Sequence, residues 1–310
     1  MTQELGLMFG GVLGVLLLGT VAGQGLRLAA RGASETVANL NARVMAWWIM
    51  CATLAAAVLI GPYGAIGLFA IVSFLALREF IALAPTSAGD HRALLWGFFV
   101  FTPLQYYLIA IDWYGLFAIL IPVYAFFLIP ATSALRGDPA RFLERTSIVQ
   151  WALIICVYNI SYVPALLLLD IEGFEDKNAQ LLLFLVIVVQ ASDVLQYVFG
   201  KLFGRHKIAP VVSPNKTWEG FVGGVACASL LGMALWWATP YDWWQAWAMA
   251  LTVALMGFAG GLVMSAIKRD RGIKDYGSLL PGHGGVLDRV DSLVFAAPIF
   301  FHLTRYFFWS

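Results

Sequence analysis

The densest group of reactive side chains lies in one polar stretch between residues 265 and 291. It mixes carboxylates with basic groups and places a histidine among glycines, in a chain in which only 12% of residues are charged. Such crowding in an apolar chain favours a functional site for an anionic, phosphate-rich ligand. The carboxylates are Asp270, Asp275, Asp288 and Asp291, and the basic groups are Lys268, Arg269, Arg271, Lys274 and Arg289.

Asp288 and Asp291 are spaced as two ligands of one metal ion would be. If Val286 begins the last helix, the two carboxylates lie three residues apart on one helical face. Carboxylate oxygens are hard ligands suited to Mg²⁺, and without a cation they would repel each other. Glycines on both sides of His283 allow the backbone to approach a phosphate closely. Asp193 adds a third carboxylate after a long apolar run, where it needs a cation or a partner.

A second polar segment, residues 213–220, precedes another apolar run and reads Ser-Pro-Asn-Lys-Thr-Trp-Glu-Gly. Ser213 followed by Pro214 predicts a helix N-cap and a first helical residue. Such a helix start would offer free backbone N–H groups to a phosphate beside Lys216. Simple capping explains the same residues equally well. Taken singly, the groups of residues 265–291 also fit ordinary roles, such as a surface pair between Asp288 and Arg289, but together they favour a site.

Long apolar runs must position these groups. Sixty-one per cent of residues are apolar and the mean hydropathy is +0.82, which predicts an all-α, polytopic integral membrane protein. Runs of about 17–25 residues can cross a bilayer. We count about nine to ten transmembrane helices, because the first run could be half-inserted. The runs are residues 5–23, 44–61, 63–84, 93–111, 113–134, 147–169, 180–200, 218–238, 243–266 and 290–308.

The basic residues predict the orientation of these helices. Of the 19 Lys and Arg residues, all except Lys177 and Arg305 fall in alternate connections. Short connections rich in Lys and Arg remain on the cytoplasmic side. We therefore expect a bacterial inner-membrane protein with its active site facing the cytoplasm and, with ten spans, both termini outside. The mildly amphipathic segment 24–43 is expected to lie on the inner surface.

The chain shows no linker or internal repeat, which predicts one membrane domain over residues 1–310. Within it, residues 1–170 would supply N-terminal helices, and residues 180–310 would supply the catalytic helices and loops. The net charge of +1 gives no sign of a nucleic-acid partner. The three cysteines lie apart within apolar runs, which fits neither a disulfide framework nor a zinc site.

The run from residue 265 to 291 resembles, throughout its length, the signature of phosphatidate cytidylyltransferases (CDP-diacylglycerol synthases). The segment 213–220 resembles a second stretch of that family, which usually reads Ser-Pro-Lys-Lys-Thr-Trp-Glu-Gly. The resemblance extends from about residue 190 to the C-terminus. One departure follows Asp193, where the family usually has Ser/Thr-Gly-Ala-Tyr and this chain has Val-Leu-Gln-Tyr. Bulky Leu195 and Gln196 beside an expected metal ligand put nucleotide fit or lipid choice in question and indicate a divergent branch.

The resemblance implies condensation of CTP with phosphatidate to give CDP-diacylglycerol and pyrophosphate at the bilayer surface. The expected cofactor is Mg²⁺, as one or two ions, with a monovalent cation also allowed; the oligomeric state is open, a homodimer included. The expected metal ligands are Asp193, Asp275, Asp288 and Asp291. The expected catalytic residues are Asp275, Asp288, Lys268, Arg269 and His283. The expected substrate-binding residues are Ser213, Asn215, Lys216, Thr217, Glu219, Lys274, Arg289, Lys201 and Arg205.

Three alternatives stay open at this point. The acceptor could be another lipid phosphate, or the enzyme could be a CTP-dependent polyprenol kinase that transfers the γ-phosphoryl group instead. A lipid-phosphate transporter would also carry charges within its membrane domain. It would, however, place them near mid-span, with interrupted helices in both halves. Here the charges cluster at one face and in one half of the chain, which favours chemistry at the surface.

Overall fold

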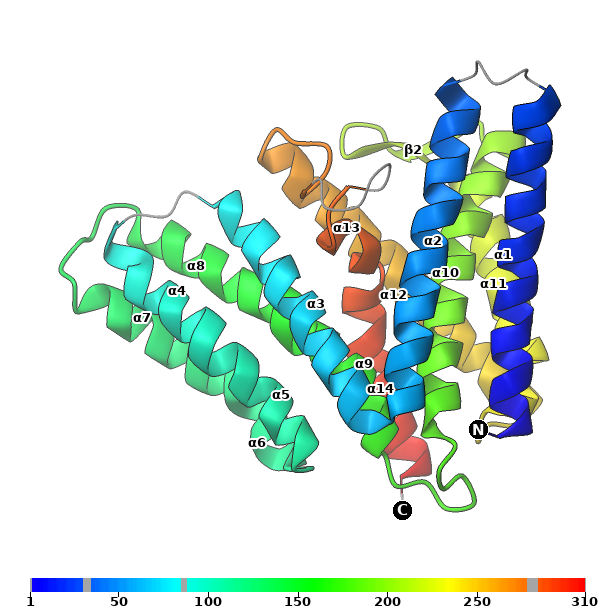
Figure 1. Ribbon diagram of the computed structural model, residues 1–310. Helices are drawn as coiled ribbons and strands as arrows, with labels where there is room; N and C mark the ends of the chain where they lie inside the picture. Colours follow the sequence, from blue (N-terminus) through cyan, green and yellow to red (C-terminus); the bar gives the residue numbers. More distant parts are fainter. Residues whose placement is uncertain (1, 30–34, 85–87, 278–283, 310) are drawn as a thin grey trace.

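The computed structural model describes residues 2–29, 35–84, 88–277 and 284–309. This part of the chain forms a bundle of long apolar helices with one small β-hairpin at one end (Figure 1). Within the described residues, eight helical stretches are long and apolar enough to cross a membrane, and two shorter apolar helices accompany them. The prediction of an all-α, polytopic membrane protein is confirmed.

Each predicted apolar run forms a helix or an end-to-end series of helical segments. In chain order the elements are α1 (Gln3–Ala29), α2 (Glu35–Ile60), α3 (Pro62–Ala82), η1 (Ala88–Asp90), α4 (His91–Trp96), η2 (Gly97–Phe101), α5 (Thr102–Ala110), α6 (Tyr114–Ile119), η3 (Leu120–Ala125), α7 (Phe126–Ala134), α8 (Phe142–Leu153), η4 (Ile154–Asn159), α9 (Ile160–Ala165), η5 (Leu166–Leu168), α10 (Asn178–Phe203), β1 (Lys207–Ala209), β2 (Ser213–Thr217), α11 (Trp218–Ala234), η6 (Trp236–Ala238), α12 (Trp243–Asp270), α13 (Leu287–Val290) and α14 (Leu293–Phe308). The segments η2 and η3 are π-helical. Pro103 follows the first and Pro122 lies in the second, where the missing N–H interrupts the regular α-helical ladder.

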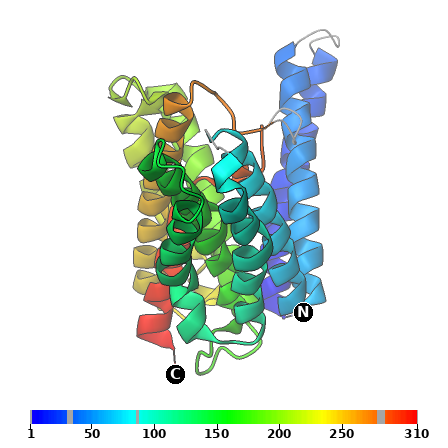
Figure 2. The ribbon, with the colours of Figure 1, turned by 90° about the vertical axis from the view of Figure 1, so that its left-hand side faces the viewer.

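The basic connections lie together at one end of the bundle. The ends of α1 and α10, the hairpin and α13 are at the top in Figure 1, and both termini are at the opposite end. Figure 2, from a direction 90° away, shows the same separation. This arrangement is the one that the alternation of basic connections predicts; which end faces the cytoplasm stays a prediction. Segment 24–43 was expected to lie on the membrane surface, and this expectation is wrong, because its described residues extend α1 and begin α2.

The predicted helix start at Ser213 and Pro214 is also wrong. Both residues lie in β2, which pairs antiparallel with β1. Helix α11 begins four residues later, with Thr217 as its N-cap, and the Thr217 hydroxyl accepts a hydrogen bond from the Gly220 N–H at 3.2 Å. Serine and threonine are both favourable N-caps, and proline is tolerated in edge strands, which both strands of a two-stranded sheet are. The pairing of Lys207 with Thr217 therefore keeps residues 213–217 in a β-strand, and the helix begins only after them.

Glycines of α11 allow it to pack closely against α10. A Cβ on Gly224 would lie 2.5 Å from the backbone N of Gln196, and one on Gly220 would lie 2.7 Å from its carbonyl O. The Gln196 amide donates a hydrogen bond to the Ser192 hydroxyl at 2.8 Å, and Leu195 packs against a small cluster on α11 and α12. The two bulky residues that depart from the resemblance therefore lie in the interface between α10 and its neighbours.

Substituting Gly224 with alanine should destabilise the bundle, because a Cβ there would overlap the backbone of α10. Overpacking of this kind costs about 1–3 kcal/mol. Gly10→Ala on α1 is the matched control, since a Cβ there meets nothing within 4 Å. Both substitutions gain the same helix propensity, so the difference between their thermal unfolding temperatures isolates the steric effect. Equal unfolding temperatures would contradict this account of the interface.

Candidate active site

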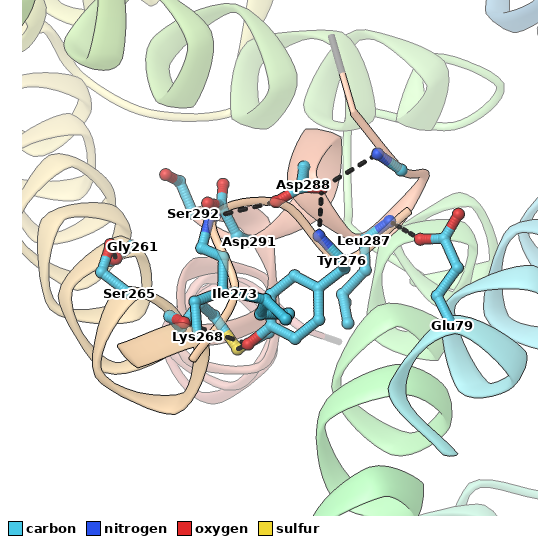
Figure 3. A network of polar contacts seen from close by, with 12 residues as sticks. Glu79, Gly261, Ser265, Lys268, Ile273, Tyr276, Leu287, Asp288, Asp291 and Ser292 are labelled. Carbon is cyan, nitrogen blue, oxygen red and sulfur yellow. Dashed lines mark hydrogen bonds and ion pairs between the residues drawn. The ribbon is translucent and has the colours of Figure 1, made fainter. Parts of the chain in front are cut away.

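A buried carboxylate, Asp288, lies at the centre of the polar network at the basic end of the bundle (Figure 3). Its Oδ1 accepts a hydrogen bond from the Lys268 amine at 3.0 Å. Its Oδ2 accepts two more, from the Tyr276 N–H at 2.8 Å and the Gly285 N–H at 2.9 Å. The side chain is only 3% exposed. A buried charge is tolerated when it is paired and hydrogen-bonded, and here the donors come from α12 and from the chain on both sides of residues 278–283.

Tyr276 contacts both members of the Lys268–Asp288 pair. Its hydroxyl donates to the Met264 carbonyl on α12 at 3.0 Å, and the Lys268 amine lies 5.4 Å from the centre of its ring. A cation at this distance is attracted to an aromatic face. Phe80 of α3 stacks on the same ring, with the centroids 6.2 Å apart. No role for Tyr276 was predicted from the sequence, although its N–H and its ring both contact the predicted catalytic pair.

Glu79, at the end of α3, holds the segment that carries Asp288. Its carboxylate accepts hydrogen bonds from the N–H groups of Val286 at 3.0 Å and Leu287 at 2.9 Å. A Cβ on Gly277 would lie 2.7 Å from this carboxylate, and one on Gly285 would be closer still. Glycine at both positions therefore leaves room for the side chain. No role for Glu79 was predicted from the sequence. Like Asp193, it is a carboxylate at the end of an apolar run, and this position could have identified it as a candidate.

A second group of charged side chains surrounds Asp193 on α10. Asp291 and Lys216 are among its electrostatic neighbours. The Lys216 amine lies 4.4 Å from the centre of the Phe258 ring. A Cβ on Gly261 would lie 3.2 Å from that amine, so the amine reaches the surface of α12. The structure thus brings together side chains from α10, from β2 and from the residues between α13 and α14.

Burial shifts the pKa values of Lys216 and Asp291 in this second group. Desolvation lowers the pKa of the Lys216 amine, while Asp193 and Asp291 act in the opposite direction. Desolvation also raises the pKa of the Asp291 carboxyl, against the influence of Lys268, Arg289 and Lys216. Burial therefore disfavours the charged forms of Lys216 and Asp291, and neighbouring charges of opposite sign partly offset this effect.

The four predicted metal ligands fall into two pairs. Asp193 lies near Asp291, and Asp275 lies near Asp288, because a Cβ on Gly284 would be 3.2 Å from the Asp275 Cβ and 2.7 Å from Asp288 Oδ2. In the part of the chain that the structure describes, no three Asp, Glu, His or Cys side chains are grouped to hold a metal ion by themselves. Nucleotide-bound Mg²⁺ usually takes only one or two carboxylates, with water and phosphate oxygens completing its shell. The Asp193–Asp291 pair fits this donor set, and metal binding stays a prediction.

The helical run that carries Asp288 and Asp291 is less regular than predicted. Val286 is the N-cap of α13, which ends at Val290, and α14 begins at Leu293. Asp291 lies in the break, where its Oδ1 accepts a hydrogen bond from the Ser292 N–H at 2.9 Å. The two carboxylates have different hydrogen-bond donors, although Asp288 remains an electrostatic neighbour of Asp291.

Several predicted site residues contact the hairpin and its flanks. The Glu219 carboxylate accepts hydrogen bonds from the N–H groups of Arg205 at 3.0 Å and His206 at 3.2 Å. It also contacts the His206 ring at 2.6 Å. Arg269 donates to the carbonyls of Val212 at 3.3 Å and Ile273 at 3.2 Å. These contacts fix the hairpin against α11 and the end of α12.

The other predicted site residues have fewer contacts. Lys201 is exposed at the end of α10, 5.9 Å from the centre of the Tyr197 ring. Asn215, Lys274 and Asp275 are exposed, and Ser213 and Arg289 are half-buried. His283 lies outside the described residues. Roles for these residues stay predictions.

Comparison with known proteins assigns the class. Residues 41–307 match the cytidylyltransferase family, and the chain belongs to that family. It is 40% identical over 301 residues to the uncharacterized protein YnbB of Escherichia coli K12, covering 94% of this chain and 95% of the relative. It is also 38% identical over 146 residues to phosphatidate cytidylyltransferases of Staphylococcus aureus and Staphylococcus saprophyticus. These matches span 46% of this chain and 56% of the staphylococcal proteins. Family membership supports a CTP-dependent transferase.

Replacing Glu79 with alanine should loosen the segment that begins α13. Two hydrogen bonds to a charged acceptor would be lost, each worth about 1.5–3 kcal/mol. We expect faster deuterium uptake in the peptide containing Val286 and Leu287, and an intermediate effect for Glu79→Gln, whose amide oxygen still accepts. Glu4→Ala, at the opposite end of the bundle, is the control. Unchanged uptake in Glu79→Ala would show that the segment is held by other contacts.

Proposed function

We propose that this protein condenses CTP with phosphatidate to give CDP-diacylglycerol and pyrophosphate, with Mg²⁺, at the cytoplasmic face of a bacterial inner membrane. Family membership and the similarity to the staphylococcal enzymes support the nucleotide chemistry. One observation carries the proposal: the Lys268–Asp288 pair and the group around Asp193 are neighbours, because Asp291 interacts with Asp193 and also with Lys268 and Asp288. A lipid phosphate and a nucleotide would meet at such a position.

The reaction requires no nucleophile from the protein. An oxygen of the lipid phosphate forms a bond to the α-phosphorus of CTP, and the bond between that phosphorus and the bridging oxygen breaks. Pyrophosphate leaves with the electron pair. Catalysis of such a transfer rests on positioning and on neutralising negative charge. Two cations support this proposal, because Lys268 is held by Asp288 and Lys216 lies against the Phe258 ring.

Each charged group has a proposed role. Asp193 and Asp291 would hold Mg²⁺, with Asp275 as a further ligand, and the ion would neutralise phosphate charge. Lys216 and Lys268 would bind the phosphates of CTP and the lipid, together with the more exposed Arg269 and Lys274. In this structure Asp288 orients Lys268 and the two N–H groups beside it.

A second candidate acceptor is a lipid phosphate other than phosphatidate. The similarity to the staphylococcal phosphatidate enzymes covers less than half of this chain, whereas the similarity to YnbB covers 94% of it. The acceptor could therefore differ while the nucleotide chemistry is retained. A polyprenol kinase would release CDP instead of pyrophosphate, so the released product separates the two kinds of reaction.

The decisive assay supplies purified protein in lipid nanodiscs with CTP, Mg²⁺ and phosphatidate. We expect equal formation of pyrophosphate and CDP-diacylglycerol. Lys216→Met should lower kcat by about 100-fold or more, the loss typical for a fixed donor to a developing negative charge. Asp288→Asn should collapse activity with membrane insertion intact, and Asp170→Asn, an exposed carboxylate at the other end, should behave as wild type. Release of CDP, or of neither product, would overturn the proposal, and full turnover by Asp288→Asn would show that the hydrogen bond from Lys268 to Asp288 is not needed for the reaction.

A further inference from the structure

A cavity of about 280 Å³ lies between α3, α8 and α12 at the basic end of the bundle. Its walls are mainly apolar side chains from all three helices. The largest of these are Phe80, Leu83, Ile148, Trp151, Val263 and Ile267. Two charged residues also line it, Asp270 and Arg271, which pair with each other at 3.2 Å. The cavity is thus an apolar space with an ionic edge.

The cavity and the candidate active site share a residue. Tyr276 lines the cavity, and the Lys268 amine lies 5.4 Å from the centre of its ring. The N–H of Tyr276 donates to Asp288. A molecule in the cavity would therefore contact Tyr276, which itself contacts both members of the Lys268–Asp288 pair.

The position of the cavity indicates an apolar occupant. Most of its lining residues belong to helical stretches long and apolar enough to cross a membrane, and they lie near the basic ends of these helices (Figure 1). A hydrocarbon chain fits such walls, and its polar end would extend toward Arg271 and Lys268. Arg271 and Lys268 each pair with one carboxylate and each carries more N–H donors than that pair uses, so an anionic headgroup would accept the remaining ones.

We propose that this cavity holds an acyl chain of the lipid phosphate that accepts the cytidylyl group. The inference rests on the proposed function and adds the path by which the acceptor reaches the site. An acyl chain in a bilayer already has apolar surroundings, so a protein cavity adds little hydrophobic driving force. The cavity acts mainly by placement: it holds one chain beside Tyr276, and the phosphate then lies within reach of Lys268.

Filling the cavity tests this placement. Ala266 lines it and is exposed on α12, so Ala266→Phe inserts a ring into the space with little effect on the core. We expect the KM for dioleoyl phosphatidate to rise about tenfold, in the range that shape differences in an apolar pocket produce. The KM values for CTP and for soluble dihexanoyl phosphatidate should stay near wild type. Ala52→Phe, on an exposed position of α2 outside the cavity, is the matched control. Equal KM values for dioleoyl phosphatidate in both variants would overturn the proposal.

A binding measurement separates this inference from the proposed function. Phosphatidate with a photoreactive diazirine in its acyl chain should label the peptide that contains Ile148 and Trp151. Unlabelled phosphatidate should compete, and phosphatidylcholine should not. Equal competition by both lipids would identify an ordinary bilayer lipid and overturn the inference. Selective labelling of a protein that releases no pyrophosphate would support the cavity as a lipid-phosphate site while removing the proposed reaction.

Discussion

The site depends on the burial of one carboxylate. Asp288 is almost completely inaccessible, and its charge is balanced by the Lys268 amine and two backbone N–H groups. Removing one partner of a buried pair leaves an uncompensated charge, which typically costs about 3–5 kcal/mol. The three donors are Lys268 on α12, the Tyr276 N–H before residue 278 and the Gly285 N–H after residue 283. Because all three bind the same carboxylate, they fix the relative positions of these segments. The buried pair therefore determines geometry more than it adds net stability.

The same segment is held from the other half of the chain. Glu79 bonds to N–H groups 207 and 208 positions away, and Phe80 stacks on Tyr276. One turn of α3 thus contacts both the start of α13 and the Tyr276 ring, beside which the Lys268 amine lies. The family match begins at residue 41 and so includes α3, although the recognisable motifs lie after residue 190. The N-terminal helices supply part of the support for the site, and two of them, α3 and α8, line the adjoining cavity.

Features set by local chemistry could be predicted from the sequence. The apolar runs predicted the helices, and Gly61 and Asp112 mark turns in which both residues have positive φ. Features set by long-range contacts could not. Ser213 and Thr217 are comparable N-caps, and only the pairing of β2 with β1 decides between them. The partner of Glu79 depends on the approach of α3 to residues 285–287, which one sequence does not reveal. The grouping of Asp193 with Asp291 was predictable because both are costly charges at apolar run ends.

The two polar groups differ in how their charge is balanced. Asp288 has its full set of protein donors, so it is already satisfied without a ligand. Asp193 and Asp291 lie close enough to repel each other, and burial raises the pKa of Asp291 while nearby cations oppose that shift. A divalent ion with phosphate oxygens would relieve this repulsion and supply the missing ligands at once. Asp288 is thus balanced by hydrogen-bond donors of the protein, whereas the neighbouring pair is balanced mainly by nearby cations with which a divalent ion would act.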